Sequence, residues 1–517
     1  MLALLVLLAG TGVFGLRPSI LRLRAKPALH RLPVSQINDV VIEQSSSMDE
    51  EPSLNYDWEK QWYAVTYAFN LPSKGEKKPY AFSVFDRELV LWRDDNDEWR
   101  CVQDKCPHRA AKLSQGQVLD GKLECLYHGW QFSGQGDCVR IPQLPSNAVI
   151  PNRACVQTYA VAFREGILWV WMGSPDTADE REIPRTSVDL ETNAKDYSRY
   201  DFQIDLPYDH SYLAENLLDP AHIPISHDRT PGGGRRENAQ AFKMTIDKSS
   251  ISVKGFKGTY QNTRPNKDGS PAPINDISFE APGIVRYLTE VKSLQFGAAL
   301  HCMPTGVGKS RLLFTTFFKA PLPFRLIFAL QPLWLRHLNS CKVLEQDIGL
   351  ITSQEDLIAR ESSQLGEQKS LSSSWLPISS SDLMLVQYRK WLDKAGRGMP
   401  YFQGYRTAST LPSTSAKPTD TTSDPQHRMT RSRYFAHVIQ NKKTLRALKI
   451  IEALLTFTRA GLFASIASGA FANSNIWKLR FLISGMVSWG FAFMLSNLRQ
   501  LFCVNFKRHE KRKVEWF

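Results

Sequence analysis

Cysteine is scarce in this sequence, with 8 residues among 517, which is too few for a disulfide scaffold. Any specialised cysteine is therefore expected to be a metal ligand or a nucleophile. No internal repeat is evident. The 13 Trp, 27 Phe and 43% hydrophobic content argue against a disordered chain, and the length predicts two or three domains.

Acidic residues are scarce in three segments that together account for the net charge of +13. Residues 1–40 contain five basic residues and one acid, residues 425–449 contain seven and none, and residues 505–517 contain five and two. The rest of the chain is nearly neutral. A basic nucleic-acid-binding surface on the folded body is therefore excluded, and no nucleic-acid partner is expected.

The N-terminal segment 1–40 has the composition of a targeting leader. Leu2–Ala9 is an apolar run too short to span a membrane, and the Arg-bearing stretch after it has no acid before Asp39. A signal followed by a transit peptide, with Phe14 near the junction, resembles the bipartite leader of plastids acquired by secondary endosymbiosis. The alternative is a plain secretory signal.

Long apolar runs occur near the C-terminus, where Ile450–Ala472 is mostly apolar and Phe481–Leu498 has no charge. The second run is near the length that crosses a hydrocarbon core of ~30 Å. The two predict a transmembrane hairpin over 450–502, connected by Asn473–Arg480, with both ends on the positive side of one membrane. Buried or interfacial helices are the alternative. A linker rich in Ser, Thr and Pro is expected over 406–440.

The strongest motif is Cys106-Pro-His108, followed after sixteen residues by Cys125-Leu-Tyr-His128. Two thiolates and two imidazoles suit zinc or a [2Fe–2S] cluster in which two His replace two Cys on one iron. A zinc finger expects Cys pairs and His pairs, whereas Cys and His alternate here. The pattern therefore favours the iron–sulfur cluster.

The residues around this motif predict a small antiparallel β domain. Ala81–Trp92 and Gly166–Trp171 are β-rich, and Gly-rich turns separate such runs. Cys101 and Cys138 lie outside the two motif loops and are expected to be ordinary buried thiols.

A second constellation, Glu215-Asn216-Leu-Leu-Asp219-Pro-Ala-His222 with His227 after it, follows about a hundred residues later. A non-haem Fe(II) oxygenase requires two His and one carboxylate on one face, with open positions for O₂ and substrate. Pro224 interrupts a helix between the histidines and can aim both imidazoles at one ion. Such a pair alone is more often structural, but after the first motif it predicts an iron site, which Glu215 and Asn216 either support or cap.

The third iron ligand is expected on Val343–Ile351, which has helical spacing. Asp347 shares the apolar face of this helix, whereas Glu345 falls on the polar face. An acid on a buried face needs a partner, which a metal supplies. A helix charge or a buried salt bridge is the alternative for Asp347.

Four other histidines have no second candidate ligand at a metal-binding spacing in the sequence. They are expected to be structural, namely His210, His301, His337 and His437.

Cys106-Pro-His-Arg together with Tyr127-His-Gly-Trp resembles the Rieske non-haem iron oxygenases. Cytochrome-complex Rieske proteins differ because each of their loops has an extra Cys. Over roughly residues 55–500 the chain resembles the pheophorbide a oxygenase group. The second constellation carries this resemblance, together with the motifs Asn55-Tyr-Asp-Trp, Leu113-Ser114-x-Gly116, Ile141-Pro142-Gln143 and Tyr388-Arg-Lys-Trp391.

The resemblance implies an α+β fold with an antiparallel β Rieske domain at 57–178, a helix-grip catalytic domain at 190–405 and a two-helix membrane hairpin. It implies a [2Fe–2S] cluster held by Cys106, His108, Cys125 and His128, and a mononuclear Fe(II) held by His222, His227 and Asp347. In the group, the acid matching Asp219 bonds an iron-site His and reaches a Rieske His of the neighbouring subunit in a homotrimer. A simple Asp-Pro turn is the alternative role.

The implied activity is that of a Rieske monooxygenase or dioxygenase, which uses O₂ and electrons from ferredoxin or a similar reductant to oxygenate a chlorophyll-derived tetrapyrrole such as pheophorbide a or chlorophyllide. The implied location is a plastid membrane, envelope or thylakoid, with the catalytic domain on the stromal side. Alternatives are another apolar plastid substrate, such as a sterol or carotenoid, or a non-catalytic redox subunit of the import machinery. Members also carry a redox Cys-x-x-Cys before the hairpin, where this chain has Asn441 and Thr444. Thioredoxin-type control through that pair is not expected.

Overall fold

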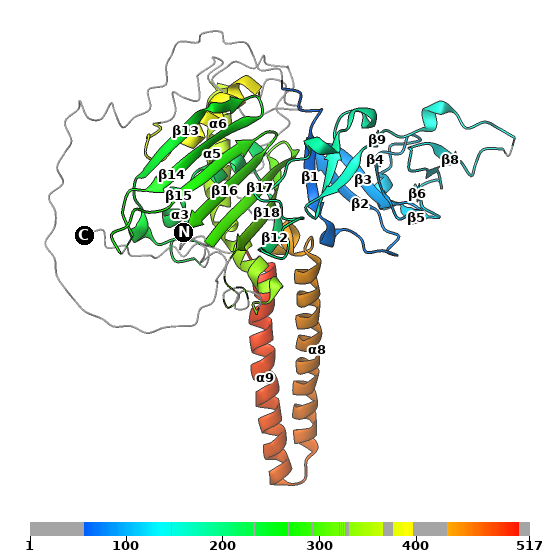
Figure 1. Cartoon of the computed structure of the whole chain (residues 1–517). Coiled ribbons are helices and arrows are strands. Elements are labelled where there is room, and N and C mark those ends of the chain that lie inside the picture. Colours follow the sequence, from blue (N-terminus) through cyan, green and yellow to red (C-terminus); the bar gives the residue numbers. More distant parts are fainter. Residues whose placement is uncertain are drawn as a thin grey trace.

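The computed structural model describes residues 56–145, 147–230, 233–266, 268–291, 294–319, 321, 323, 325, 330–364, 376–395 and 432–505. The predicted leader, residues 406–431 of the predicted linker and the basic tail from 506 onward lie outside the described residues. Figure 1 shows a small β domain beside a broad sheet backed by helices, and two long helices that project from this body.

The first domain consists of short antiparallel strands, as its β-rich runs predict. Its three sheets have the orders β1–β11–β10, β2–β3–β4–β9 and β5–β6–β7–β8. The strands are β1 (Trp62–Tyr67), β2 (Tyr80–Val84), β3 (Arg87–Arg93), β4 (Trp99–Gln103), β5 (Gln117–Leu119), β6 (Lys122–Glu124), β7 (Gln131–Phe132), β8 (Cys138–Arg140), β9 (Thr158–Tyr159), β10 (Val161–Arg164) and β11 (Ile167–Trp171). The run Ala81–Trp92 is a hairpin, because Phe85 and Asp86 both have positive φ, the conformation of a tight two-residue turn.

The second domain is a seven-stranded antiparallel sheet of order β12–β18–β17–β16–β15–β14–β13. Its strands are β12 (Ser198–Leu206), β13 (Phe242–Ser252), β14 (Gly255–Asn262), β15 (Ile274–Glu280), β16 (Ile284–Val291), β17 (Leu294–Gly306) and β18 (Lys309–Lys319). The helices packed on it are α2 (His210–Leu218), α5 (Leu333–Gln364) and α6 (Leu383–Ala395), and the single-turn α3 (Ile223–Ser226) follows α2 in the chain. The predicted α+β fold is confirmed.

The central strands β17 and β18 are buried along almost their whole length. Helix α2 contacts both strands, while β1 of the first domain packs on β12, β17 and β18. Trp169 of β11, Ile284 and Leu313 belong to one buried cluster. The two domains therefore share an apolar boundary, which explains why these strands lack the alternation of a half-exposed sheet.

Helices α8 (Lys442–Phe471) and α9 (Asn475–Cys503) form the projecting hairpin in Figure 1, and both are long and apolar enough to cross a membrane. Gly461, Ser465 and Gly469 of α8 face α9 at four-residue intervals, a spacing of small residues that lets membrane helices approach closely. The predicted connection Asn473–Arg480 is wrong in extent. Ser474 accepts a hydrogen bond from the Ile476 N–H and so starts α9 earlier.

The base of the hairpin is tied to α5 by buried charges. Residues 432–440, assigned to the linker by sequence, contain the short π-helix η10 (Tyr434–Val438) and pack against α8 and β12. Glu345 of α5 accepts hydrogen bonds from the Arg433 Nε (2.7 Å) and the His437 Nε2 (2.9 Å). The prediction that Glu345 lies on a polar face is wrong, because these residues bury a second face of α5. Burial opposes ionisation, but His437 and Arg433 hold the pKa of Glu345 at about 2.

We expect Glu345→Ala to lower the free energy of unfolding by about 3–5 kcal/mol, because it leaves the Arg433 guanidinium buried without its carboxylate. The stability difference between the variant and the unmodified protein should be constant at neutral pH. Below about pH 4.5, the ordinary pKa of this carboxyl, the difference should narrow, because the group takes up a proton in the unfolded chain while it stays ionised in the native protein until about pH 2. Denaturation of the full-length protein in detergent, followed by tryptophan fluorescence, measures both effects.

Glu88→Ala is the matched control, because Glu88 pairs with Lys112 while both side chains are about half exposed. Its cost should stay within about 1 kcal/mol. Equal costs for the two variants would contradict the structural role of the buried pair.

Candidate active site

The first motif lies on two loops with the same backbone hydrogen bonds. The Cys106 N–H donates to the Ala111 carbonyl (2.8 Å), and the Ala110 N–H donates to the Cys106 carbonyl (2.9 Å). The equivalent two bonds in the loop Cys125–Trp130 are both 2.9 Å. Ala110 and Gly129, which hold the same place in their loops, both have positive φ. The two loops therefore present their Cys and His residues in a similar way.

The loops combine buried sulfur with accessible imidazoles. Cys106 and Cys125 are each 2% exposed, whereas His108 is exposed and its ring lies 4.4 Å from that of His128. Burial, together with the neighbouring Cys125, raises the pKa of the Cys106 thiol to about 11, so a cation is needed to hold the thiolate form. This donor set fits a [2Fe–2S] cluster in which one iron takes two Cys and the other two His.

Trp130 was not identified from the sequence as part of this group. Its indole stacks on the His108 ring, with centroids 4.8 Å apart and planes inclined by 3°. The stacking fixes the orientation of His108 at the surface. The sequence feature that could have indicated this role is the position of Trp130 at the end of the second loop, as the last residue of Tyr127-His-Gly-Trp.

The second constellation surrounds two short helices. Asp219 ends α2, and His222 and His227 flank the single turn α3, whose Pro224 stands in its first turn. The His227 Nε2 lies 3.1 Å and the His222 Nε2 3.7 Å from Oδ2 of Asp347 on α5. The structure thus brings all three sequence-predicted residues together, with their ligand atoms within 4.8 Å of one another.

Neighbouring groups orient this triad. The His227 Nδ1 lies 2.9 Å from the Gln346 Oε1, and the Gln346 amide donates to the Thr230 hydroxyl (2.8 Å). The amide oxygen can only accept, so His227 donates through Nδ1 and leaves Nε2 bare. Ser226 donates to the other oxygen of Asp347. Burial raises the pKa of Asp347, but the nearby imidazoles of His227 and His222 and then the Ser226 hydroxyl outweigh it and hold this pKa below its usual range.

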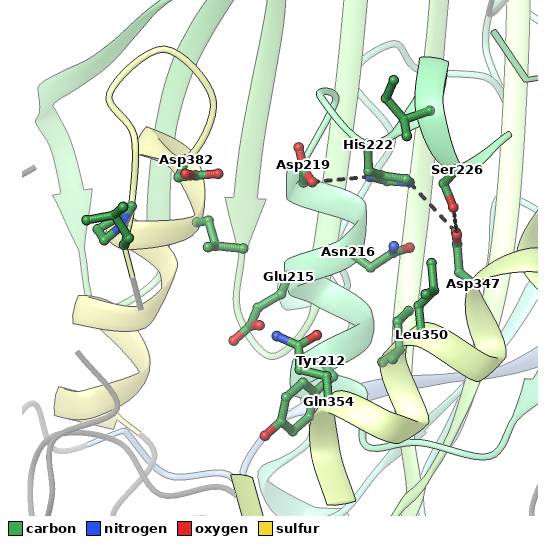
Figure 2. Close-up of a pocket in the computed structure, with 15 residues that line it drawn as sticks. Tyr212, Glu215, Asn216, Asp219, His222, Ser226, Asp347, Leu350, Gln354 and Asp382 are labelled. Atoms are coloured by element: carbon green, nitrogen blue, oxygen red, sulfur yellow. Dashed lines mark hydrogen bonds and ion pairs between the residues drawn. The ribbon is translucent and has the colours of Figure 1, made fainter. Parts of the chain in front are cut away.

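Asp219 contacts the outer nitrogen of the more accessible histidine. Its Oδ2 lies 3.4 Å from the His222 Nδ1, while its Oδ1 accepts from the Ala221 N–H (2.7 Å). Burial lowers the pKa of His222, but Asp219 and then Asp347 outweigh it and raise the pKa. Figure 2 shows Asp219, His222 and Asp347 in a row, joined by dashed lines. A carboxylate on the outer nitrogen of a histidine is a common way to orient a metal ligand.

A cavity of about 710 Å³ opens beside the triad. His222 is 22% exposed toward it, whereas the side chains of His227 and Asp347 are each 3% exposed. Apolar residues of three segments contribute to its walls, namely Ile225, Leu350, Ile351, Leu376, Pro377 and Leu385. Figure 2 shows Asp382 on the side opposite Asp219. This volume is within the range of about 300–1,000 Å³ typical of small-molecule sites.

Glu215 and Asn216 also line the cavity, but Glu215 forms an ion pair with Arg389 of α6. Glu215 therefore joins α2 to α6. Two of the predicted structural histidines lie in aromatic surroundings, since His210 lies against Trp58 and His301 against Trp169. Burial lowers the pKa of His301 to about 3.

Comparison with known families matches residues 61–160 to the Rieske [2Fe-2S] domain and residues 279–364 to pheophorbide a oxygenase. Protein TIC 55, chloroplastic, of Pisum sativum is 36% identical over 487 residues, which cover 90% of this chain and 84% of the relative. The chain belongs to the Rieske oxygenases of the pheophorbide a oxygenase and TIC 55 family. Rieske oxygenases carry a [2Fe–2S] cluster and use O₂ with electrons of the ferredoxin type.

Two further similarities agree with this family. Pheophorbide a oxygenase, chloroplastic, of Arabidopsis thaliana is 29% identical, with 76% of this chain and 74% of the relative covered. The crystal structure of dicamba monooxygenase bound to dicamba has a TM-score of 0.53 at 20% identity, covering 66% of this chain and 98% of that one. The structural similarity supports the shared Rieske oxygenase fold of the body.

We expect Gln346→Ala to weaken Fe(II) binding at the triad by about 10–100-fold, because His227 loses the acceptor that fixes its ring. Anaerobic Fe(II) titration of the iron-depleted full-length protein measures the affinity. Gln354→Ala is the control, because Gln354 lines the same cavity from the same helix. The same affinity in both variants would rule out the orienting role of Gln346.

Proposed function

We propose that this chain is a plastid-membrane Rieske oxygenase that oxygenates a chlorophyll-derived tetrapyrrole. The observation that carries the proposal is the triad of His222, His227 and Asp347 at the wall of a cavity of about 710 Å³ that is lined by both apolar and polar side chains. Two imidazoles and one carboxylate on one side of an ion leave positions open on the other, the arrangement of non-haem Fe(II) oxygenases.

The donor atoms fit such an iron. Oδ2 of Asp347 is buried and has no hydrogen-bond partner among the described residues, although it lies within 3.7 Å of both histidine Nε2 atoms. An uncompensated carboxylate oxygen in this position is costly unless a cation neutralises it. When bound, Fe(II) would supply the chemistry of O₂ activation. His222, Asp347 and His227 would hold it, and Gln346 and Ser226 would fix two of these ligands.

The cavity can accommodate a large substrate that combines apolar surface with polar groups. Leu350, Leu376 and Leu385 supply apolar contact area and help exclude water from the reacting atoms. On the wall, the Asn216 amide can donate to a carbonyl, and the Asp382 carboxylate can accept from a carboxylic acid, on the rim of a macrocycle. The choice of a tetrapyrrole rests on these features and on the relatives named for pheophorbide a.

Electron delivery is proposed to require a second copy of the chain. In Figure 1 the loops beside β4–β6 lie at the opposite end of the body from α3, so one chain does not bring its two centres together. Asp219 lines the cavity and is 27% exposed, which leaves one side of it accessible. We assign it the bridge between His222 and a Rieske histidine of the neighbouring subunit, in a homotrimer.

A plastid membrane is the proposed location. The relatives in the comparison are chloroplastic proteins, and α8 and α9 have the length and composition of membrane helices. Large apolar side chains are exposed along the hairpin, among them Phe457, Phe463 and Trp489. A lipid environment would cover them. The basic segments before α8 and after α9 favour the stromal side for the catalytic domain.

Purified full-length protein, reduced by ferredoxin and its reductase, should incorporate isotopically labelled O₂ into a tetrapyrrole. The panel contains pheophorbide a, chlorophyllide a and protochlorophyllide, with a sterol and a carotenoid as competing classes, and mass spectrometry detects the label. If the label appears in the sterol or the carotenoid and not in a tetrapyrrole, the proposed substrate class is wrong and the labelled class takes its place. Bound iron without substrate-dependent O₂ uptake would favour a non-catalytic redox subunit, which the assembled triad argues against.

The matched control carries His222→Ala and His227→Ala. It should keep the Rieske signal in electron paramagnetic resonance and lose label incorporation, because the first domain is unchanged while two triad ligands are absent. Label incorporation by this variant would refute the assigned site.

Asp219→Asn should keep both iron signals and slow turnover on the order of 100-fold, because the amide loses the charge that links two imidazoles. Rapid mixing with reduced ferredoxin should still reduce the Rieske cluster at the normal rate. Asp209→Asn is the control at the other end of α2, where Asn caps a helix as well as Asp does. Unchanged turnover in Asp219→Asn would exclude the bridging role.

A further inference from the structure

A second group of metal-ligating side chains lies at the base of the hairpin. His337 and Cys341 stand one turn apart on α5, and His437 comes from η10. Their ligand atoms lie within 4.8 Å of one another, the same limit that the first triad meets, and all three residues are at most 1% exposed. The sequence predicts structural roles for both histidines, because His437 is distant in the chain from His337 and Cys341.

The hydrogen bonds of the two imidazoles use one nitrogen of each ring and leave the other available to a metal. The His437 Nε2 must donate to the Glu345 carboxylate, which only accepts, so Nδ1 keeps a free lone pair. The His337 Nδ1 lies 2.7 Å from the Thr444 hydroxyl, which can accept its proton and leave Nε2 free. The His437 Nδ1 and the His337 Nε2 are both buried and without a hydrogen-bond partner among the described residues.

This arrangement is that of oriented metal ligands. A metal-binding histidine usually donates its other N–H to a carboxylate or another oxygen. His437 does so to Glu345, and the Thr444 hydroxyl can accept the N–H of His337 in the same way. The backbone carbonyl of Gln203 also interacts with His337, but it lies outside hydrogen-bond geometry at Nε2. Metal bonds of about 2.0 Å to nitrogen and 2.3 Å to sulfur would draw together ligand atoms that already lie within 4.8 Å of one another.

The charges around the group are compatible with a cation. Arg433 is a positive group that acts on both His337 and Cys341, and Glu345 neutralises its guanidinium, so the pair presents little net charge. Burial raises the pKa of the Cys341 thiol well above its ordinary value, with Glu345 adding to this effect and Arg433 opposing it. A bound cation would compensate the thiolate, as it does in cysteine metal sites generally.

We infer that His337, Cys341 and His437 form a second, structural metal site that binds a borderline-soft d¹⁰ cation, Zn²⁺ or Cu⁺. One thiolate and two imidazoles select such ions over the oxygen-preferring Mg²⁺ and Ca²⁺. The residues are too buried to leave an open position for a substrate, which distinguishes this site from the triad beside the cavity. The cation would clamp the start of α5 to the segment that leads into the membrane hairpin.

Elemental analysis of the full-length protein, purified in detergent without chelators, tests this site. About one equivalent of zinc or copper per chain is expected in addition to iron. X-ray absorption at the edge of that element should show one sulfur neighbour at about 2.3 Å and nitrogen at about 2.0 Å. The zinc and copper edges distinguish the two cations.

Cys341→Ser should lower the content of this metal at least about tenfold while the Rieske signal in electron paramagnetic resonance persists, which reports a folded first domain. Cys302→Ala is the control, because Cys302 is equally buried in β17 and belongs to no metal-ligating group among the described residues. Its zinc or copper content should equal that of the unmodified protein.

The absence of both metals from the unmodified protein, even after incubation with excess Zn²⁺ or Cu⁺ and removal of unbound ion, would overturn the inference. Metal that is present without a sulfur neighbour, or that Cys341→Ser retains, would overturn it as well. Because iron content and turnover are measured separately, failure here leaves the proposed oxygenase function untouched.

Discussion

Helix α5 determines the positions of three consecutive polar side chains in three different buried surroundings. Successive residues of an α-helix point about 100° apart, so Glu345 reaches the base of the hairpin, Gln346 reaches His227, and Asp347 reaches both triad histidines. A shift of one residue in the register of this helix would remove all three contacts together. The iron site and the attachment of the hairpin therefore depend on the same helix geometry.

This dependence links the membrane anchor to the catalytic domain physically. Leu338 of α5 packs in one cluster with Val438, Leu448 of α8 and Leu495 of α9. Apolar contacts therefore attach the hairpin to α5 at the same place as the Glu345–Arg433 ion pair. A buried ion pair contributes little net stability compared with apolar packing, but breaking it is costly. The pair thus favours one orientation of the hairpin relative to α5 over others that would bury either charge alone.

The sequence was informative where the contacts are local. Each metal-site loop of the first domain is one short peptide, and Pro224 between His222 and His227 fixes a local turn. Asp347 followed from the periodicity of a single helix face. Glu345 was misplaced because one apolar stripe predicts one buried face, whereas α5 is also covered by residues far along the chain. The cavity walls from 376–385 depend in the same way on tertiary packing that periodicity cannot reveal.

The turn before α8 contains Asn441 and Thr444, the two residues that stand where the resemblance predicts cysteines. Asn441 accepts a hydrogen bond from the Thr444 N–H and caps α8, and both residues are at most 5% exposed. Asn is among the best residues for this position, and the Thr444 hydroxyl in addition contacts His337. Cysteines at the two sites would lose the cap and this contact. Through the cap and the contact with His337, this turn fixes the start of the hairpin relative to α5.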